Sequence, residues 1–326
     1  MVNQDCTPRR FIFSDPLSYK IVWHQSLAEI DRTAWDTLAE PAKAPFLEWR
    51  WLNLMETSGS ITRHTGWRPC HLTVWDGNRL MGAAPLYLKS HSAGEFVFDQ
   101  VWAKAARYYD IDYFPKLVGM SPVTPIEGYR FLTAPEVDHP PMTTLMLEAI
   151  DHHCIQERLS GCSFLFADRR WAGIMLKKDC IGWMHQGYVW ENKDFNTFDD
   201  YLASFKSGQR RNIRRERQSM QNQGIAVEAI SGEELPESYI PLMYQYYTRT
   251  NARFGPWGCK YLNDAFFWGI YETYKHRLIF SAAFQIGNQS DPIGMAMVLK
   301  KGQALLGRYW GSRQAVRDLH FNVCFY

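Results

Sequence analysis

The order of strand-like and helix-like segments is the feature that most constrains this fold. The first half begins with a strand-like run at residues 19–23 and continues with helical patterns after Asp31 and over residues 45–57. Two strand-like runs then follow, joined at Asp76-Gly77, and an Asp-Gly pair between such runs is a strong hairpin signal. Strands and helices are mixed along the chain, which predicts an α/β fold with mixed sheets.

The second half repeats this order. A strand-like run at residues 225–230 precedes two helical patterns, over residues 235–250 and 261–274. Three further strand-like runs follow, near residues 278–286, 292–300 and 303–310. The segments GAAPLYLKS and GMAMVLKKG echo each other at equivalent places in the two halves. The repeat indicates an internal duplication, and we place the two domains at residues 1–195 and 196–326.

Length and composition agree with two folded domains. The chain has 326 residues, and a single core usually stops growing at roughly 250 to 300 residues. Hydrophobic residues make up 46% of the chain, which argues against disorder. No run approaches the roughly 18 consecutive apolar residues of a membrane span. We therefore predict a cytoplasmic protein without a transmembrane segment.

The cysteines give no support to a metal site. They are odd in number, scattered, and never spaced as C-x-x-C, a pattern that suits reduced thiols. The seven are Cys6, Cys70, Cys154, Cys162, Cys180, Cys259 and Cys324. We predict neither a metal nor a firmly bound cofactor.

Positive charge is concentrated in one stretch, FKSGQRRNIRRERQSM, at residues 205–220. Glu216 is its single acid, whereas the formal net charge of the whole chain is only +2. The excess is therefore local, which favours one anion site over a general nucleic-acid coat. No DNA-binding motif accompanies it, so we predict no binding to duplex DNA.

Several segments together resemble the FemAB-like family, which is linked to peptidoglycan biosynthesis or recognition and to GNAT-type acyltransferases. They are PLYLKSHSAGEFVFDQVWAKA, YFPKLVGMSPVTPIEGYRFL, FNTFDDYLASFKSGQRRNIRRER, FFWGIYE, and GRYWGS followed by LHFNVCFY. The resemblance implies tandem GNAT-like domains, each with a strand, two helices, three antiparallel strands, and a further helix and strands. The chain ends on a helical pattern, so we expect the second domain to be truncated at its C-terminus.

The resemblance also implies a reaction class. Better-studied relatives move an amino acid from aminoacyl-tRNA to a peptidoglycan precursor. For this chain it implies acyl or aminoacyl transfer to an amine, with an acyl-CoA or an aminoacyl-tRNA as donor and tRNA as a possible partner. The alternative is a non-catalytic module that binds an anionic glycan, a lipid head group or RNA.

The basic stretch supplies the candidate substrate-binding residues. Thr197 and Asp200 form a capping-box pattern ahead of it, so we expect a helix with a broad positive arc. Its guanidiniums can hold a phosphate or carboxylate by two hydrogen bonds each. The ligand could be a nucleotide-linked acceptor, an RNA acceptor stem or a CoA-type donor, and the charges could instead be a solvated face. The residues are Lys206, Arg210, Arg211 and Arg214.

A second set of binding residues ends the last strand-like run. The resemblance implies that this strand opens from its neighbour to admit the donor. Because alternate residues on a strand face opposite ways, we expect Arg308 to face a cleft and Tyr309 or Trp310 to pack. The segment after Gly311 lacks the glycines that a pyrophosphate loop needs, which argues against acetyl-CoA. We expect Lys206, Arg210, Arg211 and Arg308 to line one cleft.

The candidate catalytic residues lie in KSHSAGEFVFDQ, which contains Lys89, His91, Glu95 and Asp99. We expect a helix over residues 95–108 with Glu95 and Asp99 on one face. Acyl transfer to an amine needs a base, and histidine or a carboxylate is the usual one. His91 and Glu95 are therefore the catalytic candidates, and the alternative is a capped helix start with surface acids.

Overall fold

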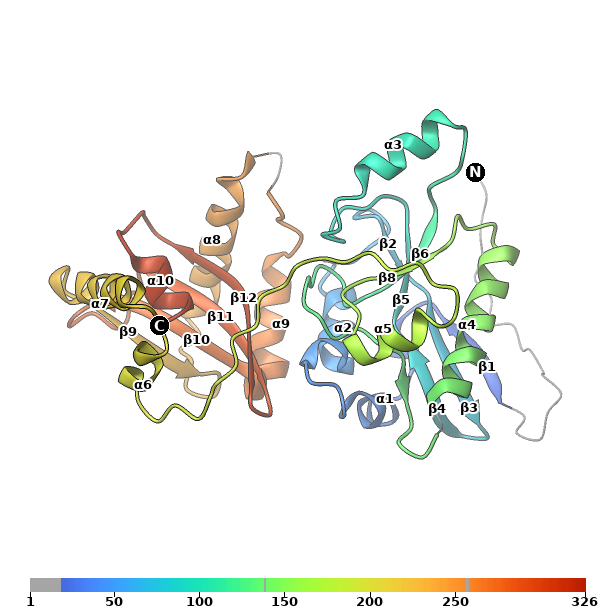
Figure 1. Cartoon of the computed structure of the whole chain (residues 1–326), viewed down its shortest axis with the longest axis horizontal. Coiled ribbons are helices and arrows are strands. Elements are labelled where there is room, and N and C mark those ends of the chain that lie inside the picture. Colours follow the sequence, from blue (N-terminus) through green and yellow to red (C-terminus); the bar gives the residue numbers. More distant parts are fainter. Residues whose placement is uncertain (1–18, 138, 256–257) are drawn as a thin grey trace. The chain divides into compact units, whose positions relative to one another are not determined.

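The computed structural model describes residues 19–137, 139–255 and 258–326, and it divides into two compact units (Figure 1). Unit 1 ends at Trp183 and also includes Tyr261–Gly269, and unit 2 comprises Met184–Lys260 and Ile270–Tyr326. We predicted two domains, at residues 1–195 and 196–326, and that these domains correspond to the two units stays a prediction. Six cysteines are free thiols here, and Cys6 lies outside the described residues.

Unit 1 contains two four-stranded sheets, ordered β1–β3–β4–β7 and β2–β5–β6–β8. Neighbouring strands are antiparallel except β6 and β8, which run parallel. The strands are β1 (Lys20–His24), β2 (Trp67–Pro69), β3 (His71–Asp76), β4 (Arg79–Ala84), β5 (Leu86–Lys89), β6 (Lys116–Gly119), β7 (Leu132–Thr133) and β8 (Cys162–Phe164). The chain passes from the first sheet to the second at Pro85, which separates β4 from β5.

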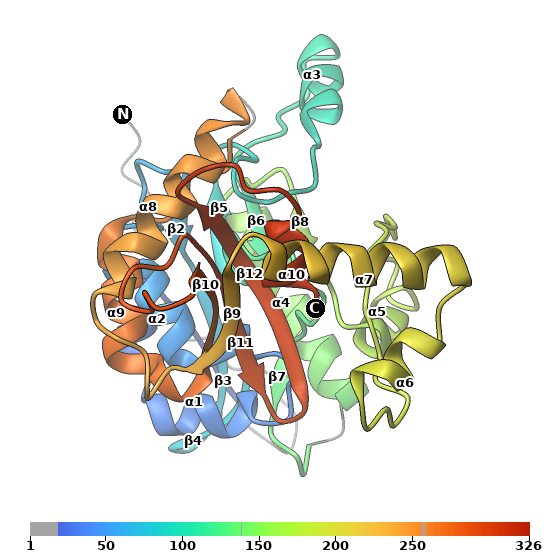
Figure 2. The same cartoon turned by 90° about the vertical axis from the view of Figure 1, so that its left-hand side faces the viewer.

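The helices of unit 1 are α1 (Arg32–Ala39), α2 (Trp49–Thr57), α3 (Gln100–Tyr108), α4 (His139–Gln156) and α5 (Arg169–Met175). Tryptophans anchor the core. Trp35 and Trp51 are fully buried, and their indole N–H groups donate to Leu47 O at 2.8 Å and to Ser121 Oγ at 3.0 Å. Such bonds satisfy the one polar atom of each large ring. By contrast, α3 has no buried residue and projects from the rest of unit 1 (Figures 1 and 2).

The mixed α/β fold is confirmed, with local exceptions. The hairpin at Asp76-Gly77 joins β3 to β4 as expected. The helix expected over residues 95–108 is wrong at its start, because α3 begins only at Gln100. Phe96 and Phe98 have φ of 59° and 53°, in the left-handed region that a right-handed helix cannot contain.

The segment GWMHQGYVW at residues 182–190 also resembles a strand in its sequence, but it does not form one. That segment has no regular secondary structure, and none of the described strands pairs with it. A strand needs such a partner for its backbone N–H and C=O groups. The apolar residues that suggested a strand, among them Met184 and Tyr188, are exposed.

Unit 2 contains one antiparallel sheet, ordered β12–β11–β10–β9 (Figure 2). Its elements are α6 (Phe198–Ala203), α7 (Ser207–Asn222), β9 (Ile225–Ser231), α8 (Tyr239–Ala252), β10 (Leu278–Gln285), β11 (Gly294–Lys301), β12 (Ala304–Ser312) and α10 (Leu319–Cys324). Helix α9 (Asp264–Tyr274) is divided between the two units after Gly269. The three consecutive strands expected in this half are confirmed as β10, β11 and β12.

Helices cover both faces of the sheet in unit 2. A Cβ at Gly294 would meet Leu319 of α10, whereas a Cβ at Gly311 would meet the backbone of α8 at Tyr246. Gly294 pairs with Ser312, the residue after Gly311, so these two contacts lie on opposite faces. Helix α7 packs against β9 and α10. Residues of α7, α10 and three strands share one core cluster, which includes Met220 and Val323.

Candidate functional site

Two lysines lie side by side on the second sheet of unit 1. Lys89 of β5 lies opposite Trp67 of β2 on one side and opposite Lys116 of β6 on the other. Side chains opposite each other on neighbouring strands share one face of the sheet, and like charges in such a pair repel. Two buried lysines side by side therefore need compensating charges.

Those charges come from the loop between β5 and α3. Glu95 and Asp99 are 0% and 1% exposed, and Lys89 and Lys116 are 0% and 5% exposed. Lys116 Nζ lies 2.8 Å from Glu95 Oε2 and 2.7 Å from Asp99 Oδ2. The Tyr113 hydroxyl also donates to Asp99 Oδ2, at 2.9 Å. We name Lys89, Glu95, Asp99 and Lys116 the charge cluster.

Asp99 is the fixed negative charge of the cluster. Burial alone would raise its pKa, but hydrogen bonds from Lys116, Ser92 and Tyr113, together with the charge of Lys116, lower it below the ordinary value. Burial and the bond to Asp99 raise the pKa of Tyr113. Asp99 is therefore ionised at neutral pH and Tyr113 is a neutral donor.

Glu95 differs from Asp99 because one of its oxygens is uncommitted. Its contact with Lys116 is an ion pair by distance but does not meet hydrogen-bond geometry, and Oε1 has no hydrogen-bond partner among the described residues. Burial raises the pKa of Glu95 by more than the charges of Lys116 and Lys89 lower it. Such a carboxylate takes up a proton more readily than an ordinary glutamate does.

Lys89 has weaker partners than Lys116. Its ammonium donates to Ala93 O at 3.1 Å and lies 3.5 Å from the centroid of the Trp67 ring. No carboxylate of the described residues is within ion-pair distance of it. Burial lowers the pKa of Lys89 to about 7, an effect that Lys116 reinforces and Glu95 opposes. Near neutral pH this amine therefore exists in both charged and neutral forms.

His91 lies at the exposed edge of the same loop. Its Nδ1 accepts a hydrogen bond from Ala93 N at 3.2 Å, which assigns the proton of the neutral ring to Nε2. The ring covers Gly66, where a Cβ would lie 2.2 Å from Nε2. Burial and the charge of Lys89 lower the pKa of His91. In this tautomer His91 is a donor, so Glu95 is the better placed proton acceptor.

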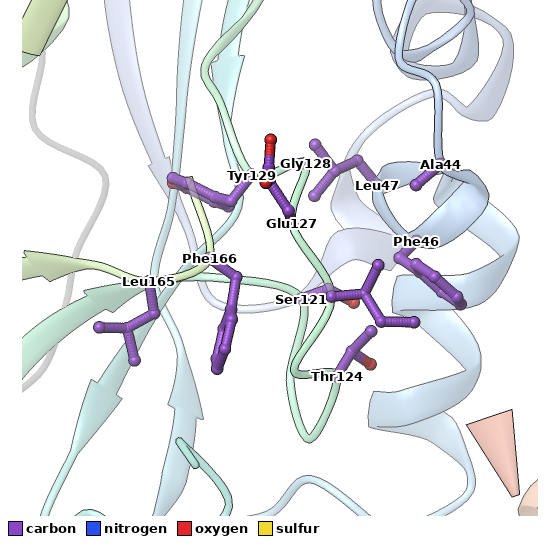
Figure 3. A pocket seen from close by; sticks show the side chains of 11 residues that line it. Ala44, Phe46, Leu47, Ser121, Thr124, Glu127, Gly128, Tyr129, Leu165 and Phe166 are labelled. Carbon is purple, nitrogen blue, oxygen red and sulfur yellow. The ribbon is translucent and has the colours of Figure 1, made fainter. Parts of the chain in front are cut away.

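A hollow lies at the carboxyl ends of the parallel strands β6 and β8 (Figure 3). The figure of about 260 Å³ for its empty space includes open solvent, so the hollow is a shallow depression and not a closed cavity. The hydroxyl of Ser121 accepts from Trp51 and that of Thr124 donates to Pro122 O, so both are engaged. Its lining residues are Ala44, Phe46, Leu47, Ser121, Thr124, Ile126, Glu127, Gly128, Tyr129, Leu165 and Phe166. The hollow is mostly apolar and suits an uncharged group.

In unit 2, helix α7 carries the predicted binding residues. The expected capping box is present, since Thr197 Oγ1 accepts from Asp200 N and Asp200 Oδ2 accepts from Thr197 N. Lys206, Arg211 and Arg214 are exposed and have no hydrogen-bond or ion-pair partner among the described residues. These three side chains, which we name the open cations, are free to bind an anion.

Other cations of α7 have internal partners. Arg210 donates to Phe205 O, and the Arg217 guanidinium lies 3.8 Å from the centroid of the Phe198 ring. The carboxylate of the single acid, Glu216, accepts from the hydroxyl of Tyr326, which follows α10 in the chain. Its nearest arginine contact is with Arg215, at 3.5 Å. The open cations are therefore not neutralised from within their own helix.

Arg308 and Tyr309 lie apart from α7. Both belong to β12, at the opposite edge of the sheet from β9, against which α7 packs. Arg308 occupies a bulge, where Met297 pairs with Tyr309 and Val298 with Gly307, and it donates to the Tyr309 hydroxyl at 2.7 Å. The structure thus places Arg210, Arg211 and Arg214 on α7 and Lys206 at its N-cap, and it does not add Arg308 to them.

Sequence reasoning missed Lys116. Its only signal in the sequence is its place as the lysine that opens the apolar run KLVG, and this run forms β6. The pairing of β5 with β6 gives Lys116 its place opposite Lys89, and this register is not visible in local sequence.

Comparisons with known proteins assign the chain to a family. The FemAB-like family model, described as peptidoglycan biosynthesis/recognition, matches residues 26–326. The chain therefore belongs to the FemAB-like family. No curated protein matches the sequence.

A solved structure titled "Crystal structure of FemX" is similar at 12% sequence identity and a TM-score of 0.46. The match covers 89% of this chain and 81% of that one. A likeness of this extent assigns neither a substrate nor a site to this chain. In the described part of the chain, no helix is long and apolar enough to cross a membrane. Among those same residues, no three histidine, cysteine or acidic side chains form a cluster that could hold a metal ion.

Proposed function

We propose that this protein is a GNAT-type acyl- or aminoacyltransferase that acylates an amine, with Glu95 as the proton acceptor. The observation that carries the proposal is the state of this carboxylate. It is fully buried, it is ion-paired to Lys116 through Oε2, and its Oε1 has no hydrogen-bond partner in the described structure. An amine that attacks an acyl carbon must lose a proton, and a nearby base with a raised pKa can receive it.

We place the donor at the hollow beside β6 and β8. Ligands of open sheets often bind beyond the carboxyl ends of parallel strands, and β6 and β8 are such a pair in unit 1. The hollow itself has room for about one water molecule, so in this proposal a small apolar group of the donor lies over its opening. The acceptor is an amine of a peptidoglycan precursor, in keeping with the family description.

The open cations on α7 support an anionic substrate. Lys206, Arg211 and Arg214 offer a phosphate or carboxylate several charge-assisted hydrogen bonds. A nucleotide-linked precursor and an aminoacyl-tRNA both carry phosphates. Which of them α7 binds is part of the proposal's test.

The first experiment identifies the ligands. Acyl-CoAs, aminoacyl-tRNAs and nucleotide-linked precursors are each added to the purified protein, and its melting temperature is measured, because a ligand that binds only the folded state raises this temperature. Ligands that do so are then combined in a transfer assay. Glu95→Gln should retain binding and lose at least about 100-fold in kcat, the usual size of a general-base effect. His91→Gln is the matched control and should lose much less.

Unchanged turnover in Glu95→Gln would refute the catalytic assignment. A second candidate function is a non-catalytic module that recognises an anionic glycan, a lipid head group or RNA, and the open cations of α7 favour it. It predicts that a ligand raises the melting temperature while no donor and acceptor pair reacts. Loss of that binding in Arg211→Gln with Arg214→Gln would then assign the function to α7.

A further inference from the structure

Helix α3 exposes apolar side chains on the side that faces away from the rest of unit 1. None of its residues is buried, and Val101 and Tyr108 are 77% and 83% exposed. The half-buried positions of the helix are Ala103 and Ala106. Each alanine is two residues from one of the exposed pair, which is roughly 200° around a helix of about 3.6 residues per turn. Val101 and Tyr108 therefore point away from the side on which the protein lies.

The apolar surface of α3 extends beyond these two side chains. Trp102 and Tyr109 are also mostly exposed, and Trp102 contacts Trp183 edge to face, with ring centroids 6.2 Å apart. We name the exposed apolar residues of this arm the α3 patch: Val101, Trp102, Tyr108, Tyr109 and Ile111. A contiguous group of exposed apolar side chains, unlike a single one, is typical of an interaction site.

Two cations lie along one edge of the α3 patch. Lys104 is three residues after Val101 and four before Tyr108, so it is beside both on the helix surface. Arg107 is three residues further on and continues the same edge. Helix α3 contains no acidic residue, although two exposed aspartates follow its end. The helix itself is therefore apolar on its outer side and positive at the edge of that side.

The charge cluster fixes the base of this arm. Asp99, which precedes α3, accepts from the Tyr113 hydroxyl at 2.9 Å and from Lys116 Nζ at 2.7 Å. The chain therefore leaves unit 1 and returns to it at one place, and α3 stands away from the sheets of its own unit (Figures 1 and 2). A helix held in this way can meet a flat surface without any rearrangement of the sheets.

We propose that α3 binds the surface of a membrane that contains anionic lipids. A helix with aromatic residues on one face and lysine or arginine beside them lies at the boundary between head groups and acyl chains, where tryptophan and tyrosine rings are favoured. Lys104 and Arg107 complement the charge of the lipid phosphates while the α3 patch enters the layer. At 9 residues α3 is too short to span a bilayer, which needs roughly 20. The proposal goes beyond the transfer reaction and does not depend on it.

Flotation of the whole chain with lipid vesicles tests the proposal. The vesicles consist of phosphatidylcholine alone or of equal parts phosphatidylcholine and phosphatidylglycerol. We expect the protein to float with the mixed vesicles. Val101→Ser with Tyr108→Ser should weaken this binding by at least about tenfold, because less apolar surface enters the layer. The matched control is Ile155→Ser, which alters an isolated exposed residue of α4 and should change binding by less than about twofold.

The charged groups give a second comparison. Lys104→Gln with Arg107→Gln should weaken binding to the mixed vesicles by about tenfold, because two cations near an anionic surface are lost. Asp110→Asn with Asp112→Asn should strengthen the same binding, because two exposed negative charges beside the helix are removed.

Four results would overturn the proposal. The wild type floats with neither kind of vesicle, or Ile155→Ser loses as much binding as the variant of Val101 and Tyr108. A third is binding that is lost when the open cations of α7 are replaced by glutamine and is retained in that α3 variant, since α7 would then be the lipid-binding element. The fourth comes from sedimentation equilibrium without lipid: a mass that rises with concentration in the wild type and not in the α3 variant would assign the α3 patch to a second copy of this chain.

Discussion

The two units use charge in opposite ways. Unit 1 buries Lys89 and Lys116 opposite each other on two paired strands, and the loop between β5 and α3 brings two buried acids against Lys116. Unit 2 displays Lys206, Arg211 and Arg214 in solvent without partners in the described structure. Burial shifts pKa values and thereby permits proton transfer, whereas exposure leaves cations ready for a ligand. This difference is the basis of our proposal that unit 1 carries the chemistry and that unit 2 binds the anion.

The largest effect is expected from Lys116→Met. This change leaves Glu95 and Asp99 buried without their common partner, which should lower the free energy of unfolding by about 3 to 5 kcal/mol. Urea unfolding followed by circular dichroism measures it. The control Lys104→Met alters an exposed lysine on α3 and should change the value by less than about 0.5 kcal/mol. Equal effects of the two changes would remove the contrast between buried and exposed charge.

The next effect is a pH dependence that Lys89 gives to unit 1. Its pKa is about 7 in the folded chain and 10.5 ordinarily. Between these values the unfolded chain binds one more proton at this site, so the free energy of unfolding rises with pH, by about 1 kcal/mol per pH unit. The difference between the wild type and Lys89→Met, measured by urea unfolding from pH 7 to 9.5, isolates this contribution. A difference that does not vary with pH would contradict it.

In unit 2 the expected effect is on binding and leaves stability almost unchanged. Replacing Lys206, Arg211 and Arg214 together by glutamine should weaken the binding of inorganic tripolyphosphate by at least about tenfold, because three charge-assisted contacts are lost. Isothermal titration calorimetry at fixed salt measures this. The matched control replaces Lys104 and Arg107, exposed cations on α3, and should change the affinity by less than about twofold. An equal loss in the control would show general charge attraction instead of a site.

The smallest effect separates the cations within α7. Arg217 lies over the Phe198 ring, so Arg217→Gln should lower the free energy of unfolding by about 0.5 to 1 kcal/mol and leave tripolyphosphate affinity nearly unchanged. Arg214→Gln should weaken tripolyphosphate binding and leave the free energy of unfolding nearly unchanged. Melting curves and titrations of the two single variants test the distinction, which fails if both lose affinity to the same extent.

Short sequence patterns correctly predicted the structures that depend only on interactions between neighbouring residues. The Asp76-Gly77 hairpin and the capping box at Thr197 depend on neighbouring residues, and both formed as expected. The loop before α3 did not, because Phe96 and Phe98 adopt a left-handed backbone that aromatic residues rarely take. The loop instead brings Glu95 and Asp99 to Lys116, a contact that depends on tertiary packing.

The candidate site was likewise predicted only in part. The sequence singled out Glu95 and His91 as neighbours of Lys89, and the structure groups all three around one loop. It could not reveal that Glu95 would be buried with a free oxygen, or that His91 would be a donor. Both properties come from a fold in which β5 and β6 pair in one register.

The proposal that unit 1 carries the chemistry and unit 2 binds the anionic substrate is tested most directly by one steady-state comparison. With a donor and an acceptor selected by their effect on the melting temperature, kcat and KM are measured for Glu95→Gln and for the variant that lacks the three open cations of α7. The account predicts a loss in kcat with KM retained for Glu95→Gln, and a rise in KM with kcat retained for the α7 variant. The reverse pattern, or full kcat in Glu95→Gln, would contradict it.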